Sequence, residues 1–292
     1  MLFGEYSLIC NSMGLVVPFR SFSAQWDWIK KTDKTGFSKK SNAHLRNFHV
    51  FLENNADYRE ILDLSCMLHE LDNGLFFNST IPQGYGAGSS GALVAAVYQR
   101  FLKNNPDFTT NELRYVLAGM EAYFHGNSSG IDPISCYLGE TVLIDENSNI
   151  ICVENPLNMT NQPIKVFLVD TKLPRETTML MQHFGTQLHQ YRFYKKLHDQ
   201  LIPAVNQAIQ HFRKGDATIF FKSAHAISAF EYTYFEPMVP DEMRSLWQKG
   251  LQNSDYIMKL CGSGGGGYLL AFATDENSLQ SITERFEVIP LQ

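Results

Sequence analysis

The chain has 292 residues and a net charge of −6 at pH 7, which allows one large or two moderate domains around a sizeable core. The negative balance and the lack of a long run of Lys or Arg are not typical of a nucleic-acid-binding surface, so we expect no nucleic-acid partner. The opening residues lack the basic and apolar regions of a signal peptide, and no apolar run is long enough to cross a bilayer. We therefore expect a soluble, cytoplasmic protein without a membrane partner.

A first half rich in strands and turns precedes a second half of amphipathic helices, which predicts an α+β fold. Strands are expected at 2–9, 15–19, 22–29, 75–77, 138–144, 150–153, 166–169, 256–260 and 268–273. Helices are expected at 42–52, 61–71, 113–124, 176–184, 187–212, 217–232, 241–252 and 277–286, with a further helix after residue 89. The polar turn before strand 150–153 indicates a boundary, and the predicted domains are 1–155 and 156–292.

Residues 81–92 read Ile-Pro-Gln-Gly-Tyr-Gly-Ala-Gly-Ser-Ser-Gly-Ala and lead into the apolar run 93–98. Alternating glycines let backbone N–H groups approach a ligand, and two serines at a helix start add hydroxyls beside the positive end of its dipole. The lysine of a P-loop is missing, and Ser89 stands where a dinucleotide fingerprint needs glycine. A turn that merely packs closely would not explain the proline, the alternation and the paired serines together. The segment therefore predicts a phosphate-binding cradle.

A second polar segment, residues 121–132, carries Glu121 on a helix and Asp132 after a loop rich in Gly and Ser. Phosphoryl transfer needs one carboxylate to hold magnesium and another to orient or deprotonate the attacking hydroxyl. Taken singly, each residue is better explained by a structural role, Glu121 as a solvated helix residue and Asp132 as a turn or helix-cap residue. The pair becomes informative only beside the cradle.

The cradle resembles the second motif of the GHMP small-molecule kinases, with Ala87 and Gly91 in place of the usual Leu and Ala. Residues 2–6 with 14–18 resemble the first motif of that family, and residues 259–270 resemble the third. Residues 121–132 resemble the mevalonate kinase branch, matching it at His125, Gly126, Asn127, Ser129, Gly130 and Asp132, while Ser128 replaces a proline. Residues 170–175 are similar to another segment of the same branch. The resemblance spans nearly the whole chain.

This resemblance implies a two-domain kinase with an N-terminal ribosomal S5 domain 2-like part and a C-terminal, helix-rich ferredoxin-like part. It implies ATP and Mg2+ as cofactors and a small molecule as the acceptor of the phosphoryl group. The favoured acceptor is mevalonate, and its phosphorylated product is an isoprenoid precursor. Asp132 is implied as catalytic base, and Ser90 and Glu121 as magnesium ligands. The implied ATP contacts are Pro82, Gly84, Gly86, Ala87, Gly88, Ser89 and Ser90, and the implied acceptor contacts are Glu5, Tyr6, Ser129, Gly130 and Gly264. The resemblance allows a homodimer, but the residues themselves do not indicate an oligomeric state.

Two departures from the family concern the first motif. The family has a lysine ahead of the glutamate that Glu5 matches, and this sequence begins after that position. We expect either that the chain is shortened or that the site differs. Tyr6 replaces the histidine that the family has after this glutamate, so the resemblance does not define the acceptor contact at this position. Phosphomevalonate kinase, homoserine kinase and a nucleotide-binding homologue without turnover remain the alternative functions.

Overall fold

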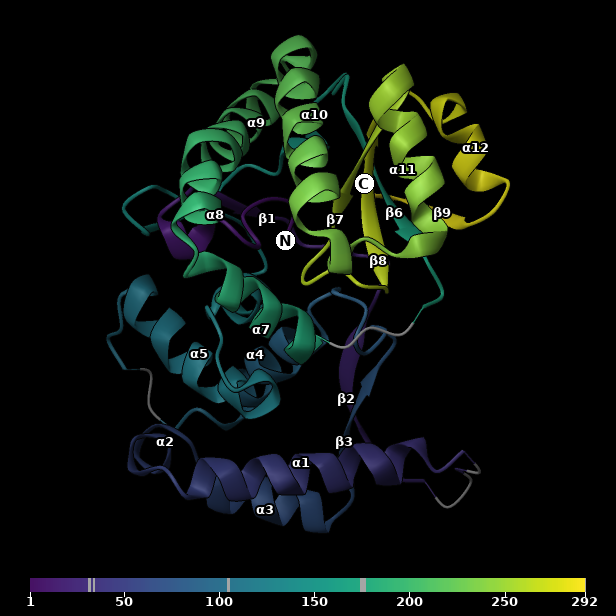
Figure 1. The fold of residues 1–292 in the computed structure, drawn as a ribbon. Coiled ribbons are helices and arrows are strands. Elements are labelled where there is room, and N and C mark those ends of the chain that lie inside the picture. The colour runs from purple at the N-terminus through teal and green to yellow at the C-terminus, as the bar shows by residue number, and fades with distance from the viewer. Residues whose placement is uncertain (31–32, 34, 104–105, 174–176, 292) are drawn as a thin grey trace. The chain divides into compact units, whose positions relative to one another are not determined.

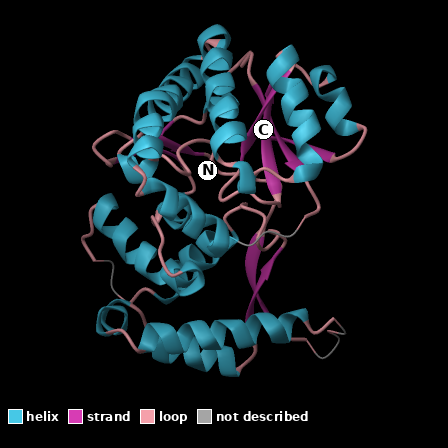
Figure 2. Ribbon diagram, viewed as in Figure 1, coloured by secondary structure: helices cyan, strands magenta, loops and turns pink. Residues whose placement is uncertain are grey.

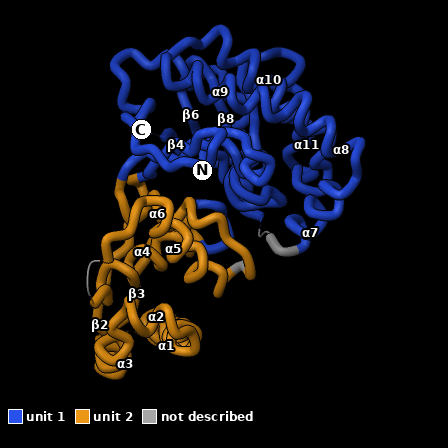
Figure 3. Tube along the Cα trace, turned by 90° about the vertical axis from the view of Figure 1, so that its left-hand side faces the viewer, with its two compact units in different colours: residues 1–19, 83–87, 140–292 blue, residues 20–82, 88–139 orange. Residues whose placement is uncertain are grey.

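The computed structural model describes residues 1–30, 33, 35–103, 106–173 and 177–291. The chain forms two compact units that interleave along the sequence (Figure 3). Unit 1 comprises Met1–Phe19, Gln83–Ala87 and Glu140–Gln292, and unit 2 comprises Arg20–Pro82 and Gly88–Gly139. The predicted domains 1–155 and 156–292 stay a prediction.

Unit 1 is built on an antiparallel four-stranded sheet in the order β7-β8-β6-β9 (Figure 1). Its strands are β6 (Lys165–Asp170), β7 (Tyr256–Leu260), β8 (Tyr268–Ala273) and β9 (Glu287–Leu291). Every residue of β7 and β8 is buried, because apolar side chains cover both faces of these strands. The sequence predicts β7 and β8 correctly to the residue.

Helices cover this sheet, and those of unit 1 are α7 (Thr177–Leu188), α8 (Tyr191–Lys196), α9 (Ile202–Lys214), α10 (Ala217–Tyr234), α11 (Asp241–Asn253) and α12 (Gln280–Thr283). Helix α10 packs on both α9 and β7. The core between helices and sheet is aromatic: the rings of Phe220 and Phe272 lie 5.2 Å apart, and Phe3 stacks on Phe272 at 5.5 Å. Such aromatic contacts add to the free energy gained from burial.

The single helix predicted over residues 187–212 is instead interrupted. Helix α7 ends at Leu188, and a π-helical turn over Leu197–Leu201 separates α8 from α9. Pro203 explains part of this break, because it has no N–H for the helical hydrogen bond to the preceding turn.

A second sheet of unit 1 has the order β1-β4-β5, with strands β1 (Gly14–Val16), β4 (Thr141–Ile144) and β5 (Ile150–Val153). The strand predicted at 2–9 is wrong: only Phe3 forms a bridge, to Leu15, and a 3₁₀ turn spans Leu8–Cys10. Gly4 causes the change of direction, since its φ is 109° and its carbonyl accepts the N–H groups of Ser7 and Leu8.

Unit 2 contains a two-stranded sheet of β2 (Ala24–Trp28) and β3 (Leu75–Ser79) together with helices (Figure 2). The helices are α1 (Phe37–Glu53), α2 (Ala56–Ile61), α3 (Leu64–Asp72), α4 (Ser89–Phe101), α5 (Thr110–His125) and α6 (Ile131–Leu138). Helix α5 begins with a capping box between Thr109 and Glu112. Helix α4 packs against both α5 and α6.

Both units mix helices and sheets, so the predicted α+β class is confirmed. Among the helices that the structure describes, none is both long and apolar enough to cross a membrane.

Candidate active site

The carboxylate of Glu121 in unit 2 is held by two serine hydroxyls. Ser90 Oγ, in the first turn of α4, donates to Glu121 Oε1 at 2.7 Å, and Ser128 Oγ donates to Oε2. Glu121 is only 5% exposed, so α5 presents an acidic side chain to the interior of the unit. The predicted metal ligands Ser90 and Glu121 are therefore brought together.

Burial raises the pKa of Glu121, the negative charge of Asp132 raises it further, and the hydrogen bonds from the two serines oppose the shift. The carboxylates of Glu121 and Asp132 therefore interact electrostatically, although they belong to different helices. A cation bound near them would stabilise both carboxylates in their ionised forms.

Asp132 is the second residue of α6, whose N-cap is Gly130 with φ 71°. A carboxylate in a first helical turn interacts favourably with the helix dipole. A Cβ on Gly130 would lie 2.3 Å from the carbonyl oxygen of Arg114, and Arg114 Nε donates to the carbonyl of Ser129 at 2.7 Å. These contacts fix the loop that carries the predicted acceptor residues Ser129 and Gly130.

Gly91 allows α4 and α6 to pack closely beside Asp132. An added Cβ at Gly91 would lie 2.9 Å from the carbonyl carbon of Asp132 and from the nitrogen of Pro133. Because Gly91 directly follows Ser90, this close approach also brings Asp132 of α6 near the end of α4 that carries Ser90. A side chain at position 91 would push Asp132 away.

We expect Gly91→Ala to destabilise the fold by roughly 1–3 kcal/mol, since both clashing atoms belong to the backbone and cannot rotate away. Turnover should fall as well, because Asp132 moves. Urea unfolding and steady-state kinetics measure the two effects. Gly185→Ala, in α7, is the matched control, since a Cβ there meets no atom within 4 Å. Unchanged stability of Gly91→Ala would show that α4 and α6 do not need this close approach.

The predicted phosphate cradle adopts the backbone conformation that its glycines permit. Gly84, Gly86 and Gly88 have φ values of 76°, 79° and 74°, which other residues rarely adopt. Gly88 is the N-cap of α4 and offers no side chain to the first turn. Ser89 and Ser90 form the first turn of α4, and the N–H groups of a first helical turn are the ones that bind anions in proteins.

Pro82 closes the unit 2 segment before the loop, and residues 83–87, with Ala87 at their end, group with unit 1. There the N–H of Tyr268 donates to the carbonyl of Tyr85 at 3.1 Å. A Cβ on Gly267 would lie 2.6 Å from Tyr85 Cα. The glycine-rich loop between β7 and β8 is thus a packed connection against the cradle segment.

Three other predicted acceptor residues lie in unit 1 and are well packed. Tyr6 is 3% exposed and lies among Phe184 and Phe235, with ring centroids 4.9 and 4.5 Å away. Gly264 avoids a clash, since a Cβ would lie 2.7 Å from the carbonyl oxygen of Met238. Glu5 is covered as well, and its carboxylate forms an ion pair. Their predicted contacts with an acceptor stay predictions.

The ion pair of Glu5 is a feature that the sequence analysis missed. Lys259 Nζ donates to both carboxylate oxygens of Glu5 at 2.7 Å and lies 3.9 Å from Glu231 Oε1. Burial opposes the charge of Lys259, but the two carboxylates outweigh it and raise its pKa; burial raises the pKa of Glu231 to about 8. The signal was present, because a lysine inside the apolar strand 256–260 needs a buried partner.

Ser128 was noted only as a departure from the family, yet it binds Glu121. The segment 170–175 is described in part: Lys172 Nζ donates to Asp170 at 2.7 Å, whereas Pro174 and Arg175 lie outside the described residues. Among the described residues there is no group of three or more His, Cys, Asp or Glu side chains that could hold a metal ion. A cation at Glu121 would therefore need ligands beyond the protein's carboxylates.

Comparison with known proteins shows a partial family match and a shared fold. Residues 51–140 match the family model of the GHMP kinases N terminal domain. No curated protein sequence matches the chain. The mevalonate kinase of L. major in complex with R-mevalonate is 17% identical, with a TM-score of 0.65, over 100% of this chain and 93% of that one.

Two further solved structures share the fold. The Streptococcus pneumoniae phosphomevalonate kinase, in complex with phosphomevalonate and AMPPNP, is 12% identical with a TM-score of 0.61, covering 97% of this chain and 92% of that one. The Lactococcus lactis galactokinase complexed with galactose is 16% identical with a TM-score of 0.65, over 100% and 90%. Residues 51–140 are thus similar to the N-terminal domain of the GHMP kinases, the chain shares the fold of solved GHMP kinases, and mevalonate kinases are prominent among its structural neighbours.

Proposed function

We propose that this protein is an ATP-dependent kinase that phosphorylates a hydroxyl of a small acid, with mevalonate as the favoured acceptor. The observation that carries the proposal is the Ser90–Glu121 hydrogen bond beside Asp132, at the start of a helix that follows a glycine-rich loop. With mevalonate, the product is 5-phosphomevalonate, and the reaction belongs to the synthesis of isoprenoid precursors.

In this proposal the first N–H groups of α4 bind phosphate oxygens of ATP, and Ser90 and Glu121 bind magnesium. The residues fit that ion, because Mg2+ prefers hard oxygen ligands and commonly takes one or two from protein and the rest from water and phosphates. When bound, the ion neutralises charge on the phosphate oxygens of the nucleotide.

Asp132 orients the acceptor hydroxyl and accepts its proton. The hydroxyl oxygen forms a bond to the γ-phosphorus while the bond from that phosphorus to the bridging oxygen of ADP breaks. The proton passes to Asp132, and ADP leaves with the electron pair of the broken bond. Asp132 suits this role because it is partly exposed at the start of α6, where a reacting group can reach it.

The experiment is a screen of ATP consumption with mevalonate, 5-phosphomevalonate, homoserine and galactose as acceptors, confirmed by mass spectrometry of the product. Preferred turnover of mevalonate supports the proposal. If another acceptor is turned over preferentially, the proposed kinase activity stands and that acceptor replaces mevalonate as the proposed substrate. Nucleotide binding without turnover of any of the four would favour a non-catalytic nucleotide-binding homologue.

Glu121→Gln should lower turnover at limiting magnesium by roughly tenfold or more, because the variant loses a charged oxygen ligand. The same variant should not destabilise the fold without magnesium. The pKa of Glu121 in the fold lies above its unfolded value, so this carboxylate makes folding less favourable as pH rises above about 4.5. A neutral amide removes that dependence.

Magnesium titrations of the initial rate and urea unfolding at two pH values, without magnesium, measure both effects. Glu60→Gln is the matched control, because Glu60 is an exposed helix residue of the same unit. If Glu121→Gln kept full activity at limiting magnesium, Glu121 would have no part in the metal site.

A further inference from the structure

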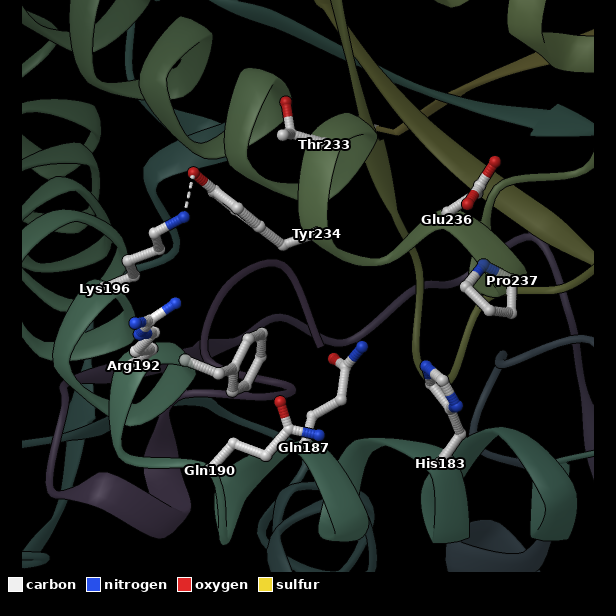
Figure 4. Close-up of a pocket in the computed structure, with 10 residues that line it drawn as sticks. His183, Gln187, Gln190, Arg192, Lys196, Thr233, Tyr234, Glu236 and Pro237 are labelled. Carbon is white, nitrogen blue, oxygen red and sulfur yellow. Dashed lines mark hydrogen bonds between the residues drawn. The ribbon is translucent and has the colours of Figure 1, made fainter.

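Unit 1 contains a pocket of about 360 Å³ between α7, α8 and the carboxyl end of α10 (Figure 4). The side chains that matter for the argument are those of His183, Gln187, Arg192, Lys196, Tyr234 and Glu236. None of them is among the predicted catalytic, metal, ATP or acceptor residues. The volume lies at the lower end of the range of small-molecule sites, which favours a ligand smaller than a nucleotide.

One end of the pocket is positively charged. Arg192 and Lys196 are four residues apart on α8, so they lie on the same face of the helix. Lys196 Nζ donates to the hydroxyl of Tyr234 at 2.9 Å and lies 4.3 Å from the centroid of its ring. Within the described part of the chain, no carboxylate forms an ion pair with Arg192 or Lys196. Their charges are available to an anion.

At the opposite end of the pocket lies Glu236, the one carboxylate among the described residues that line it. Its side chain is 77% exposed and lies 3.8 Å from Arg244 Nη2, so solvent and a cation screen it. In Figure 4, Glu236 is on the far side of the pocket from Arg192 and Lys196. The charge distribution therefore orients a ligand with its anionic group toward α8.

Gln187 adds a requirement for a hydrogen-bond donor. Its side-chain oxygen is buried, and among the residues that the structure describes it has no hydrogen-bond partner. A buried acceptor without a partner costs free energy that a ligand hydroxyl would recover. In Figure 4 the Gln187 amide rises from α7 toward the space below Tyr234.

We propose that this pocket binds a small hydroxy acid, with its carboxylate or phosphate at Arg192 and Lys196 and a hydroxyl near Gln187. The proposal concerns binding by unit 1 and does not rest on the kinase function. It has a structural consequence, because Glu236 begins the 3₁₀ turn Glu236–Met238 and the carbonyl of Met238 accepts the N–H of Gly265 at 2.6 Å. The ligand would contact the segment that holds the glycine-rich loop.

Calorimetry with mevalonate and with 5-phosphomevalonate tests the proposal and distinguishes a carboxylate from a phosphate as the bound anion. Isovalerate, which has the carboxylate but no hydroxyl, tests the role assigned to Gln187. We expect Arg192→Met and Lys196→Met each to weaken binding by at least about tenfold, the scale of a lost charge-assisted hydrogen bond. Lys195→Met is the matched control, because Lys195 is an exposed neighbour on α8 that does not line the pocket.

Hydrogen exchange adds a readout of position: the ligand should protect amides in residues 191–196, and thermal melting should show each variant to be folded. Equal affinity of the wild type and both variants, or no binding of either probe, would overturn the proposal. If Arg192→Met kept both its turnover and its affinity for the ligand, the proposed binding site at this pocket would be refuted. The proposed kinase function would be unaffected.

Discussion

Asp132→Asn is expected to lower kcat by on the order of a hundredfold or more while leaving binding of ATP and acceptor largely intact, since positioned acid–base catalysis contributes on this scale. Asparagine keeps the size of the side chain at the start of α6 but cannot accept the proton of the acceptor hydroxyl. The variant should also lower the pKa of Glu121, because the charge of Asp132 helps to raise it. Steady-state kinetics and nucleotide calorimetry measure the first effect.

Asp107→Asn serves as the matched control, since Asp107 is an exposed carboxylate of the same unit. The change in Glu121 can be followed by carboxyl-specific infrared or NMR titration, a readout that does not depend on turnover. Asp132→Asn with the rates of its parent on every acceptor would refute the assignment of Asp132 as base.

Lys259→Met is expected to cost about 3–5 kcal/mol of folding free energy, because it leaves the buried carboxylate of Glu5 without a partner. The loss should grow with pH. Burial raises the pKa of Glu231 and Lys259 opposes that shift, so without Lys259 this pKa lies further above its unfolded value and the variant becomes less stable as pH increases. Urea unfolding between pH 5 and pH 8 measures the effect.

Two variants make that experiment specific. Lys165→Met removes a lysine from an exposed position on β6 and should change stability by no more than about 0.5 kcal/mol. The double variant Glu5→Gln/Lys259→Met should regain part of the loss, since the buried carboxylate of Glu5 is no longer left without its partner. A Lys259→Met protein as stable as the wild type at pH 8 would mean that the ion pair contributes nothing to the fold.

The sequence predicted best those elements whose pattern is local. Strands β7 and β8 are short apolar runs beside glycines, and helix α5 has its own capping box, so neighbouring residues suffice to define them. The strand predicted at residues 2–9 was wrong because its apolar residues are typical of a strand, whereas the backbone turns at Gly4. Strand β9 directly follows the predicted helix 277–286 and was not predicted, because its structure depends on pairing with the distant β6.

The candidate site was predicted unevenly for the same reason. The segment that leads to Asp132 and the segment before α4 are continuous motifs, so the sequence predicts both. The structure places Ser90 within hydrogen-bond distance of Glu121. Contacts between distant residues were not visible: Lys259 pairs with Glu5 across most of the chain, and Ser128 binds Glu121 through a loop conformation. The pocket at α8 joins helices α7, α8 and α10, which a reading by local pattern treats separately.

Strand β9 has a consequence for how this protein behaves in solution. It covers the edge of β6, whose residues 166–170 are buried, and an uncovered edge of that kind would template pairing with another chain. Pro290 of β9 supplies no N–H, and proline in edge strands is placed with its nitrogen facing away from the partner strand. Because Pro290 has no N–H, β9 offers one backbone donor fewer than a strand without proline, which disfavours pairing of the free edge of the sheet with another chain.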